Sequence, residues 1–363
     1  MICPPQHKEL VSLICHFIMA RCLRGCLGGW SQLAREIVIV IVDEFSAEEM
    51  LRRLSDPFWF QAFGCVLGYD WHSSGVTTTV CGALKEGIRG LERDLGLFIA
   101  GGKGRTSRKT PSEIENSGHL LKVNPSSLVY ASRMSAKVDS SALQDGYQLY
   151  HHSFFYTTDG SWAVVQQGMN EVNCYARRYH WLGENVTDFV CEPESAICSQ
   201  AKGETLNLVA SESTKARNVI AHIAAEEKPG NIVTQLKKLK TLNLPQRAYI
   251  SLDDIHPERL NKIFISTYER KPNSFESLLG LEGVGAKTLR ALSLISELVY
   301  DTPVSLRDPV SYSFAHGGKD GYPYPVDRKT YDSSIQFLAQ AVDKAKIGDR
   351  EKLAAFRKLK AWQ

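Results

Sequence analysis

The sequence has almost no net charge, no long apolar run and no paired metal-ligand spacing, and each absence excludes a class of protein. Its 43 lysines and arginines against 40 acidic residues leave a net charge of +3, which excludes a histone-like polycation but not a local basic surface. No segment approaches the roughly 18–20 consecutive apolar residues of a membrane span, so we expect no membrane association. The nine cysteines include no Cys-x-x-Cys pair, which indicates reduced thiols in the cytoplasm rather than zinc ligands.

A length of 363 residues is enough for two domains. Residues 1–30 carry four of the cysteines and show no clear periodicity, and we treat them as a poorly defined leader. Mixed helix and strand patterns occupy residues 31–205, whereas residues 206–363 are mostly helical in pattern. The predicted fold class is therefore α+β, with an α/β domain followed by an all-α domain.

Local patterns in the first domain predict particular elements. Residues 31–54 have a helical pattern with a capping signal, and the aromatic stretch Asp56–Gly64 is typical of a buried segment. The β-branched run Val76–Val80 predicts a strand. Residues 147–169 predict a hairpin around a Thr-Asp-Gly turn, and residues 192–213 are expected to form a loop or linker.

The strongest motif lies at residues 278–292, where two glycines stand one residue apart at the start of a predicted helix. Such glycines permit a tight turn, and the free amides of the helix that follows can hold a phosphate. This resembles the helix-hairpin-helix motif of DNA-binding proteins. The resemblance implies a sequence-independent grip on the DNA backbone, and the residues that would provide it are Gly283, Gly285, Lys287 and Thr288. The alternative is an ordinary glycine-rich turn between two helices.

A Gly/Pro-rich loop after this motif leads to Asp327, which precedes a predicted helix from about Arg328 to Val342. A hairpin, a loop and then an aspartate resemble the endonuclease III superfamily of DNA glycosylases, over roughly residues 230–345. The resemblance implies that Asp327 stabilises a cationic sugar or activates a nucleophile, and that Lys287 attacks the sugar. The spacing between the two is longer than in that family, its usual histidine and iron–sulfur cysteines are absent, and the alternative is that Asp327 only caps a helix.

Most of the chain, from about residue 33 to 345, also resembles an uncharacterised bacterial and archaeal family defined only as a domain of unknown function. The segments that carry the resemblance are Leu54–Cys65, Asp70–Thr78 and Ala100–Gly104. Members usually begin with a Leu-His-Gly-Gly-Lys motif, and the first thirty residues here do not contain it. This resemblance supports the domain plan and implies no particular activity.

Basic stretches provide further candidates for contact with nucleic acid. Residues 228–247 contain no acidic residue, and residues 344–360 are strongly basic. Aromatic and basic residues alternate over Tyr175–Trp181, a pattern that could stack on unpaired bases or form a packed helix. The loop at residues 101–110 contains no acidic residue and does not match a nucleotide P-loop, and its candidate DNA contacts are Lys103, Arg105, Arg108 and Lys109.

Acidic residues and histidines suggest a second kind of chemistry. Asp70 and His72 lie in a glycine-flanked turn and could hold a divalent metal for phosphodiester cleavage, provided that acids further along the chain converge on them. His151 and His152 are neighbours on a predicted strand, so at most one of them points into any site. The residues that could complete a metal site with Asp70 and His72 are Asp139, Asp145, His151, His152 and Asp159.

Together these patterns predict a DNA-binding protein that acts in DNA repair or processing. Three hypotheses stay open. The first is a glycosylase/lyase that uses Asp327 and Lys287, and the second is a metal-dependent nuclease centred on Asp70 and His72. The third is a DNA-binding module without catalytic activity. Only the nuclease requires a cofactor, a divalent metal, and DNA is the one partner that the sequence indicates.

Overall fold

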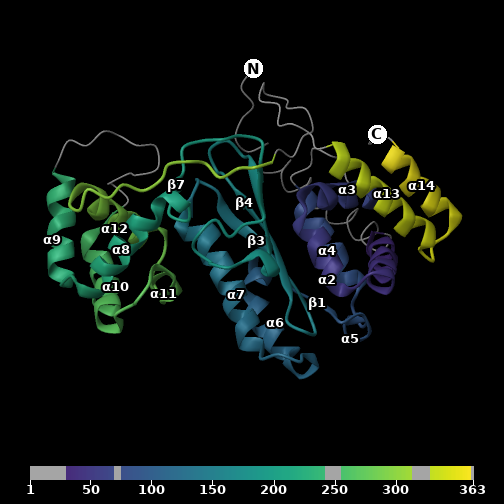
Figure 1. Cartoon of the computed structure of the whole chain (residues 1–363), viewed down its shortest axis with the longest axis horizontal. Coiled ribbons are helices and arrows are strands. Elements are labelled where there is room, and N and C mark those ends of the chain that lie inside the picture. The colour runs from purple at the N-terminus through teal and green to yellow at the C-terminus, as the bar shows by residue number, and fades with distance from the viewer. Residues whose placement is uncertain (1–29, 69–74, 242–254, 313–327, 361–363) are drawn as a thin grey trace, which may run out of the picture.

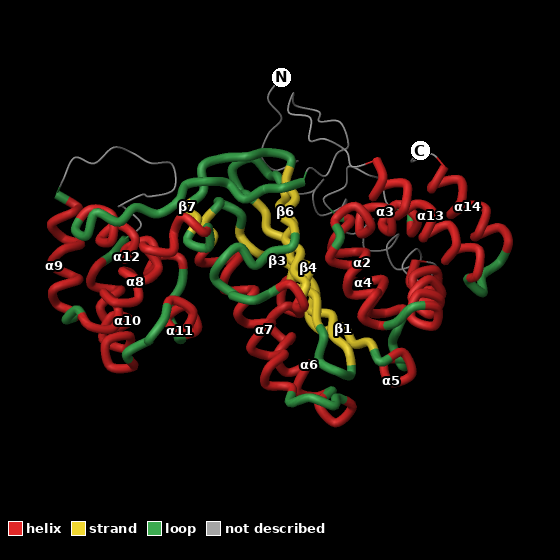
Figure 2. Tube along the Cα trace, in the orientation of Figure 1, coloured by secondary structure: helices red, strands yellow, loops and turns green. Residues whose placement is uncertain are grey.

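The computed structural model describes residues 30–68, 75–241, 255–312 and 328–360. These residues form three layers, in which one β-sheet lies between two groups of helices (Figure 1). Figure 2 shows the strands of this sheet running edge-on through the middle of the molecule. The predicted α+β class is confirmed, and the large sheet is antiparallel throughout.

The five-stranded sheet has the order β1-β3-β4-β5-β6. The predicted hairpin at 147–169 is confirmed, because β3 and β4 pair directly with Phe154 opposite Val164. The predicted loop at 192–213 is wrong in part, since it contains an edge strand and half of a small two-stranded sheet, β2 with β7. The strands are β1 (Leu97–Lys103), β2 (Leu143–Gln144), β3 (Gln148–Thr157), β4 (Trp162–Met169), β5 (Ala176–Leu182), β6 (Ala196–Ser199) and β7 (Leu206–Asn207).

One face of the sheet packs against helices from both ends of the described chain. Phe155 and Val165 lie in the same hydrophobic cluster as Trp59 and Phe63 from the aromatic stretch, which is buried as predicted. Leu338 from near the C-terminus joins this cluster. The helices of this layer are residues 30–44, α2 (Ala47–Ser55), α3 (Pro57–Leu67), α4 (Val76–Gly87), α5 (Glu92–Leu95), α13 (Arg328–Lys344) and α14 (Asp349–Lys360).

The predicted strand Val76–Val80 is wrong, because these residues begin α4. Val76, Val80, Ala83 and Leu84 are all buried and recur at the spacing of one helix face. Packing of this face against the aromatic helix α3 outweighs the strand preference of the β-branched residues.

The opposite face of the sheet packs against α6 and α7, and a bundle of helices α8 to α12 lies beyond them (Figure 1). Phe154, Tyr156 and Trp181 from the sheet form one core with these helices. A short π-helical turn, Val138–Ala142, continues α7 into β2. The helices are α6 (Thr110–Asn116), α7 (Pro125–Lys137), α8 (Thr214–Glu226), α9 (Pro229–Lys240), α10 (Pro257–Arg270), α11 (Phe275–Gly280) and α12 (Ala286–Leu298).

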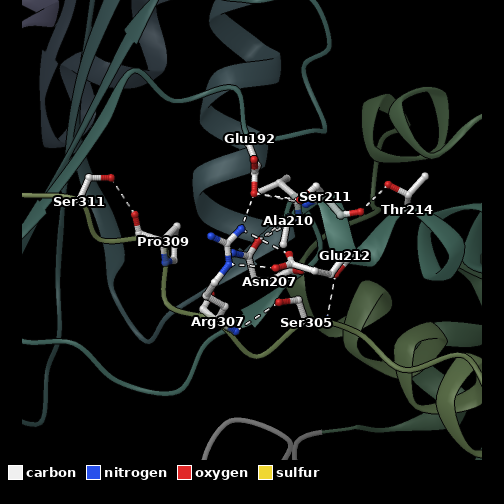
Figure 3. Close-up of polar contacts among 12 residues, drawn as sticks. Glu192, Asn207, Ala210, Ser211, Glu212, Thr214, Ser305, Arg307, Pro309 and Ser311 are labelled. Carbon is white, nitrogen blue, oxygen red and sulfur yellow. Dashed lines mark hydrogen bonds and ion pairs between the residues drawn. The ribbon is translucent and has the colours of Figure 1, made fainter.

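The segment after α12 runs back along the sheet and ties the helical bundle to it (Figure 3). Its Ser305 pairs with Asn207 of β7 as an isolated bridge, and the Asn207 side chain donates to the Arg307 carbonyl at 3.0 Å. The Arg307 guanidinium forms ion pairs with Glu192 and Glu212 (Figure 3). This segment leads away from the bundle, and the next described helices, α13 and α14, contact α3 in the other layer. The predicted boundary at residue 205 stays a prediction.

Candidate functional site

The glycine motif forms a turn between α11 and α12. Gly283 has φ of 84°, a left-handed conformation that side-chain-bearing residues rarely adopt. Gly285 is the N-cap of α12 in an extended conformation, and no side chain caps the helix there. The first turn of α12 contains no acidic residue. The amides of Ala286, Lys287 and Thr288 therefore begin the helix without intrahelical acceptors.

The side chains of the turn divide between surface and core. Lys287 is exposed, whereas Thr288 is only 1% exposed and Val284 3%. The hydroxyl of Thr288 thus lies inside the helical bundle and not at the surface. Of the predicted contacts in this turn, the backbone around Gly283 and Gly285 and the cation of Lys287 remain on the outside.

Lys137 at the end of α7 binds backbone carbonyls of the turn between α11 and α12. Its ammonium donates to the carbonyl oxygens of Leu279 at 2.6 Å, of Leu281 and of Val284 at 3.3 Å. Burial lowers the pKa of Lys137. No local pattern in the sequence signals this contact, because Lys137 lies more than 140 residues before the turn.

A second tie joins α12 to the small sheet. The Gln144 amide donates to the Ala286 carbonyl at 2.9 Å, and its oxygen accepts from Arg290 at 2.9 Å. The turn is therefore held by the last residue of α7 and by a residue of β2.

The predicted basic loop consists of the end of β1 and the 3₁₀ helix η1 (Gly104–Lys109). All four of its predicted DNA contacts are exposed, namely Lys103, Arg105, Arg108 and Lys109. Gly101 before them has φ of 87°, and a Cβ atom there would stand 2.2 Å from the carbonyl oxygen of His152. This glycine is thus required by the close approach of β1 to β3.

A cavity of about 270 Å³ lies between η1, α7 and β3. Arg108 of η1 and Arg133 of α7 line it together with Tyr150 of β3. Ser132, His152 and Gln166 form another part of its wall. Arg133 lies one helical turn before Lys137, so a single helix borders this cavity and also holds the glycine turn.

Hydrogen bonds connect this wall to a buried carboxyl pair. The Ser132 hydroxyl contacts Nε2 of His152 at 2.9 Å, and Nδ1 of His152 contacts Oε1 of Gln166 at 2.8 Å. The Gln166 amide donates to Asp139, which also accepts from the Trp181 indole at 2.9 Å. Burial raises the pKa of Asp139 well above its usual value and also that of the neighbouring Glu194.

The two adjacent histidines take different partners, although both are among the residues that line the cavity. His152 contacts Ser132 beside the cavity, while His151 is on the other face of β3, where its Nε2 contacts the Ser153 hydroxyl at 3.0 Å. Burial lowers the pKa of His151 to about 3 and that of His152 to about 4. Both imidazoles are therefore neutral near pH 7.

The acids proposed for a metal site take separate partners. Asp139 accepts a hydrogen bond from the Gln166 amide, Asp145 pairs with Arg177 at 3.0 Å, and Asp159 pairs with Lys122 at 2.9 Å on the surface. Within the described ranges, no group of three His, Cys, Asp or Glu side chains could hold a metal ion. Other predicted site residues lie outside the described residues, namely Asp70, His72 and Asp327.

The base-stacking hypothesis for Tyr175–Trp181 is wrong, and so is its helical alternative. All of these residues except Tyr175, which is 38% exposed, lie in β5, in which all seven side chains are buried. Arg177 is fully enclosed between Asp145 and Asp308, at 3.0 and 2.8 Å. The alternation of basic and aromatic residues here reflects the two covered faces of a central strand.

The chain matches the model of a known protein family. A family model described as "Protein of unknown function (DUF763)" matches residues 28–326, which bears out the resemblance to a domain-of-unknown-function family. No curated protein and no solved structure matches the chain. Among the described helices, none is long and apolar enough to cross a membrane.

Proposed function

The chain belongs to the DUF763 family, and from this starting point we propose that it binds the phosphate backbone of DNA through the turn between α11 and α12. The observation that carries the proposal is the geometry of this turn. Left-handed Gly283 and extended Gly285 present the start of α12 without a side-chain cap. Free amides and the positive end of the helix dipole form an anion site of the kind that phosphates occupy.

The side chains around the turn favour the same ligand. Lys287 is exposed in the first turn of α12, where its charge would add to that of the helix end. The buried Val284 and the three carbonyls held by Lys137 give the turn a fixed shape before any ligand arrives. A preformed site loses less conformational entropy on binding.

The basic end of β1 and η1 supports a second contact with the backbone. Its four cations are exposed, so their charges can reach phosphates. Backbone contacts of this kind position a protein on DNA without reading its sequence. A role in repair or processing, and the catalytic roles of Lys287 and Asp327, stay predictions.

Salt-dependent binding of a fluorescent DNA duplex tests the proposal. Each phosphate contact removed should lower the slope of log K against log salt by about 0.9. We expect Lys287→Ala to weaken binding and to lower the slope by about this amount. The matched control is Arg93→Ala, which removes one exposed positive charge from α5 at the other end of the molecule (Figure 1).

A second variant tests the backbone geometry independently of charge. Gly283→Ala places a Cβ atom where φ is 84°, although space is available, since the nearest atom of Ile263 would stand 3.6 Å away. We expect it to weaken binding without changing the salt slope by a full contact. If Lys287→Ala and Gly283→Ala both bind the duplex with the affinity of the wild type at every salt concentration, the proposal is refuted.

A further inference from the structure

The cavity beside α7 contains a serine and a histidine whose hydrogen bonds fix the position of each proton. The Gln166 amide nitrogen donates to Asp139 and to the Ser135 carbonyl at 3.3 Å. These two acceptors require the nitrogen on that side, so the oxygen of the Gln166 amide faces His152. Nδ1 of His152 must then carry the proton that it donates to this oxygen at 2.8 Å.

With the proton on Nδ1, the neutral imidazole has its lone pair on Nε2. The Ser132 hydroxyl, 2.9 Å from Nε2, must therefore donate its proton to His152. A hydroxyl that donates to a neutral imidazole, which a third group orients through its other nitrogen, is the arrangement of an activated nucleophile. Ser132 and His152 are 2% and 6% exposed, and both line the cavity.

The remaining groups of the cavity favour a small anionic ligand. Arg108 and Arg133, two basic residues, are among those that line it. The Tyr150 hydroxyl accepts a hydrogen bond from Gln167, so its own proton is available to a ligand. None of the described residues that line the cavity is acidic. Its volume of about 270 Å³ lies just below the usual range for drug-sized ligands, about 300–1,000 Å³.

We propose that this cavity binds small phosphate monoesters and that Ser132 is the nucleophile that hydrolyses them. Two guanidinium groups match the charge of a phosphoryl group and can bind its oxygens in pairs. The proposal does not depend on DNA binding by the turn at Gly283, because it uses none of the residues of that turn; it shares only Arg108 with the proposed second DNA contact.

The reaction has two steps. Ser132 Oγ attacks phosphorus while His152 Nε2 takes the hydroxyl proton, and the bond from phosphorus to the ester oxygen breaks. The leaving oxygen keeps the electron pair of that bond and receives the proton from His152. Water then attacks the phosphorus of the phosphoserine while His152 Nε2 takes a proton from it, and the bond from phosphorus to Ser132 Oγ breaks. Ser132 Oγ regains its proton from His152, and inorganic phosphate leaves. Arg108 and Arg133 stabilise the charge on the phosphoryl oxygens in both steps.

Hydrolysis of para-nitrophenyl phosphate by the full-length protein tests the chemistry. We expect release of nitrophenolate, and after an acid quench we expect phosphate on the peptide that contains Ser132. Ser132→Ala should lose both signals. His152→Gln should lower kcat by about 10²–10⁴-fold with little change in KM, because it removes the base and keeps a polar side chain.

A variant of one arginine and a control serine complete the set of variants for this experiment. Arg133→Ala should raise KM, and inorganic phosphate should compete with the substrate in the wild type. Ser126→Ala, at an exposed position on the same helix, is the matched control and should retain full activity. Circular dichroism of each variant verifies the fold. Activity retained in Ser132→Ala, or neither nitrophenolate nor phosphoserine from folded wild-type protein, overturns the proposal.

Discussion

His180 makes the stability of the protein depend on pH in a direction that the structure determines. It is completely buried, its Nδ1 is 2.9 Å from the Leu54 carbonyl, and its Nε2 accepts from the Arg178 guanidinium at 2.8 Å. Burial, and then the charge of Arg178, hold the pKa of His180 well below its usual value of 6.5. Protonation at Nε2 would break the bond to Arg178 and place two buried cations in contact.

The unfolded chain has no such constraint, so its His180 takes up a proton as the pH falls below about 6.5. Because the folded pKa is the lower one, the stabilisation is complete above pH 6.5 and is lost as the pH falls toward the folded pKa. Each pH unit in this window removes about 1.4 kcal/mol from the free energy of unfolding. Acidification from pH 7 to pH 5 therefore costs about 2 kcal/mol through this residue alone.

Urea unfolding followed by circular dichroism across this pH range measures the effect. His151 and His152 act in the same direction, and the buried carboxyls Asp139 and Glu194 act in the opposite one. The contribution of His180 is therefore read as the difference in slope between wild type and His180→Gln. We expect that slope to fall by about 1.4 kcal/mol per pH unit. His119→Gln, which removes an exposed histidine, is the control. An unchanged slope in His180→Gln would show that the reasoning is wrong.

Three further substitutions test contacts that support the site and the core. Asp308→Ala leaves the buried Arg177 with half of its carboxylate partners, so we expect a loss of about 3–5 kcal/mol in urea unfolding. Gly101→Ala should cost at least about 1–3 kcal/mol from its backbone conformation, with a further cost from the carbonyl of His152 at 2.2 Å, and should lower the melting temperature. Lys137→Met should speed hydrogen exchange in α11 and α12, because three carbonyls lose their donor. Unaltered exchange there would mean that other contacts hold the turn.

Local signals predicted the elements that local interactions determine. The turn at residues 158–160 specified the hairpin of β3 and β4, and Ser46 caps α2 as its sequence suggested, with its hydroxyl accepting from the Glu49 amide at 3.1 Å. The strand expected at Val76–Val80 failed because the same β-branched residues also fit one helix face. Burial against α3 decided between the two, and a single sequence does not reveal that neighbour.

In the candidate sites too, some features follow from the local sequence and others depend on tertiary packing. Once the hairpin turn is placed, its register sets His152 opposite Gln166, so that this pair was predictable in principle. The approach of Ser132 was not, because it depends on how α7 packs across the sheet. The exposure of Lys287 follows from its place at a helix start, whereas the burial of Thr288 follows from the bundle around it. Pairings between distant segments are decided by packing and leave no spacing pattern in the sequence.

The packing of α13 and α14 against α3 also constrains how the chain folds during synthesis. The residues of α3 leave the ribosome about 260 residues before those of α13. At a synthesis rate of about 5–20 residues per second, the residues of α13 and α14 are made on the order of tens of seconds after those of α3. During this time α3 lacks its contacts with α13 and α14. Helices α13 and α14 thus complete the layer to which α3 belongs, and a nascent chain that stalls before them presents an apolar surface to chaperones.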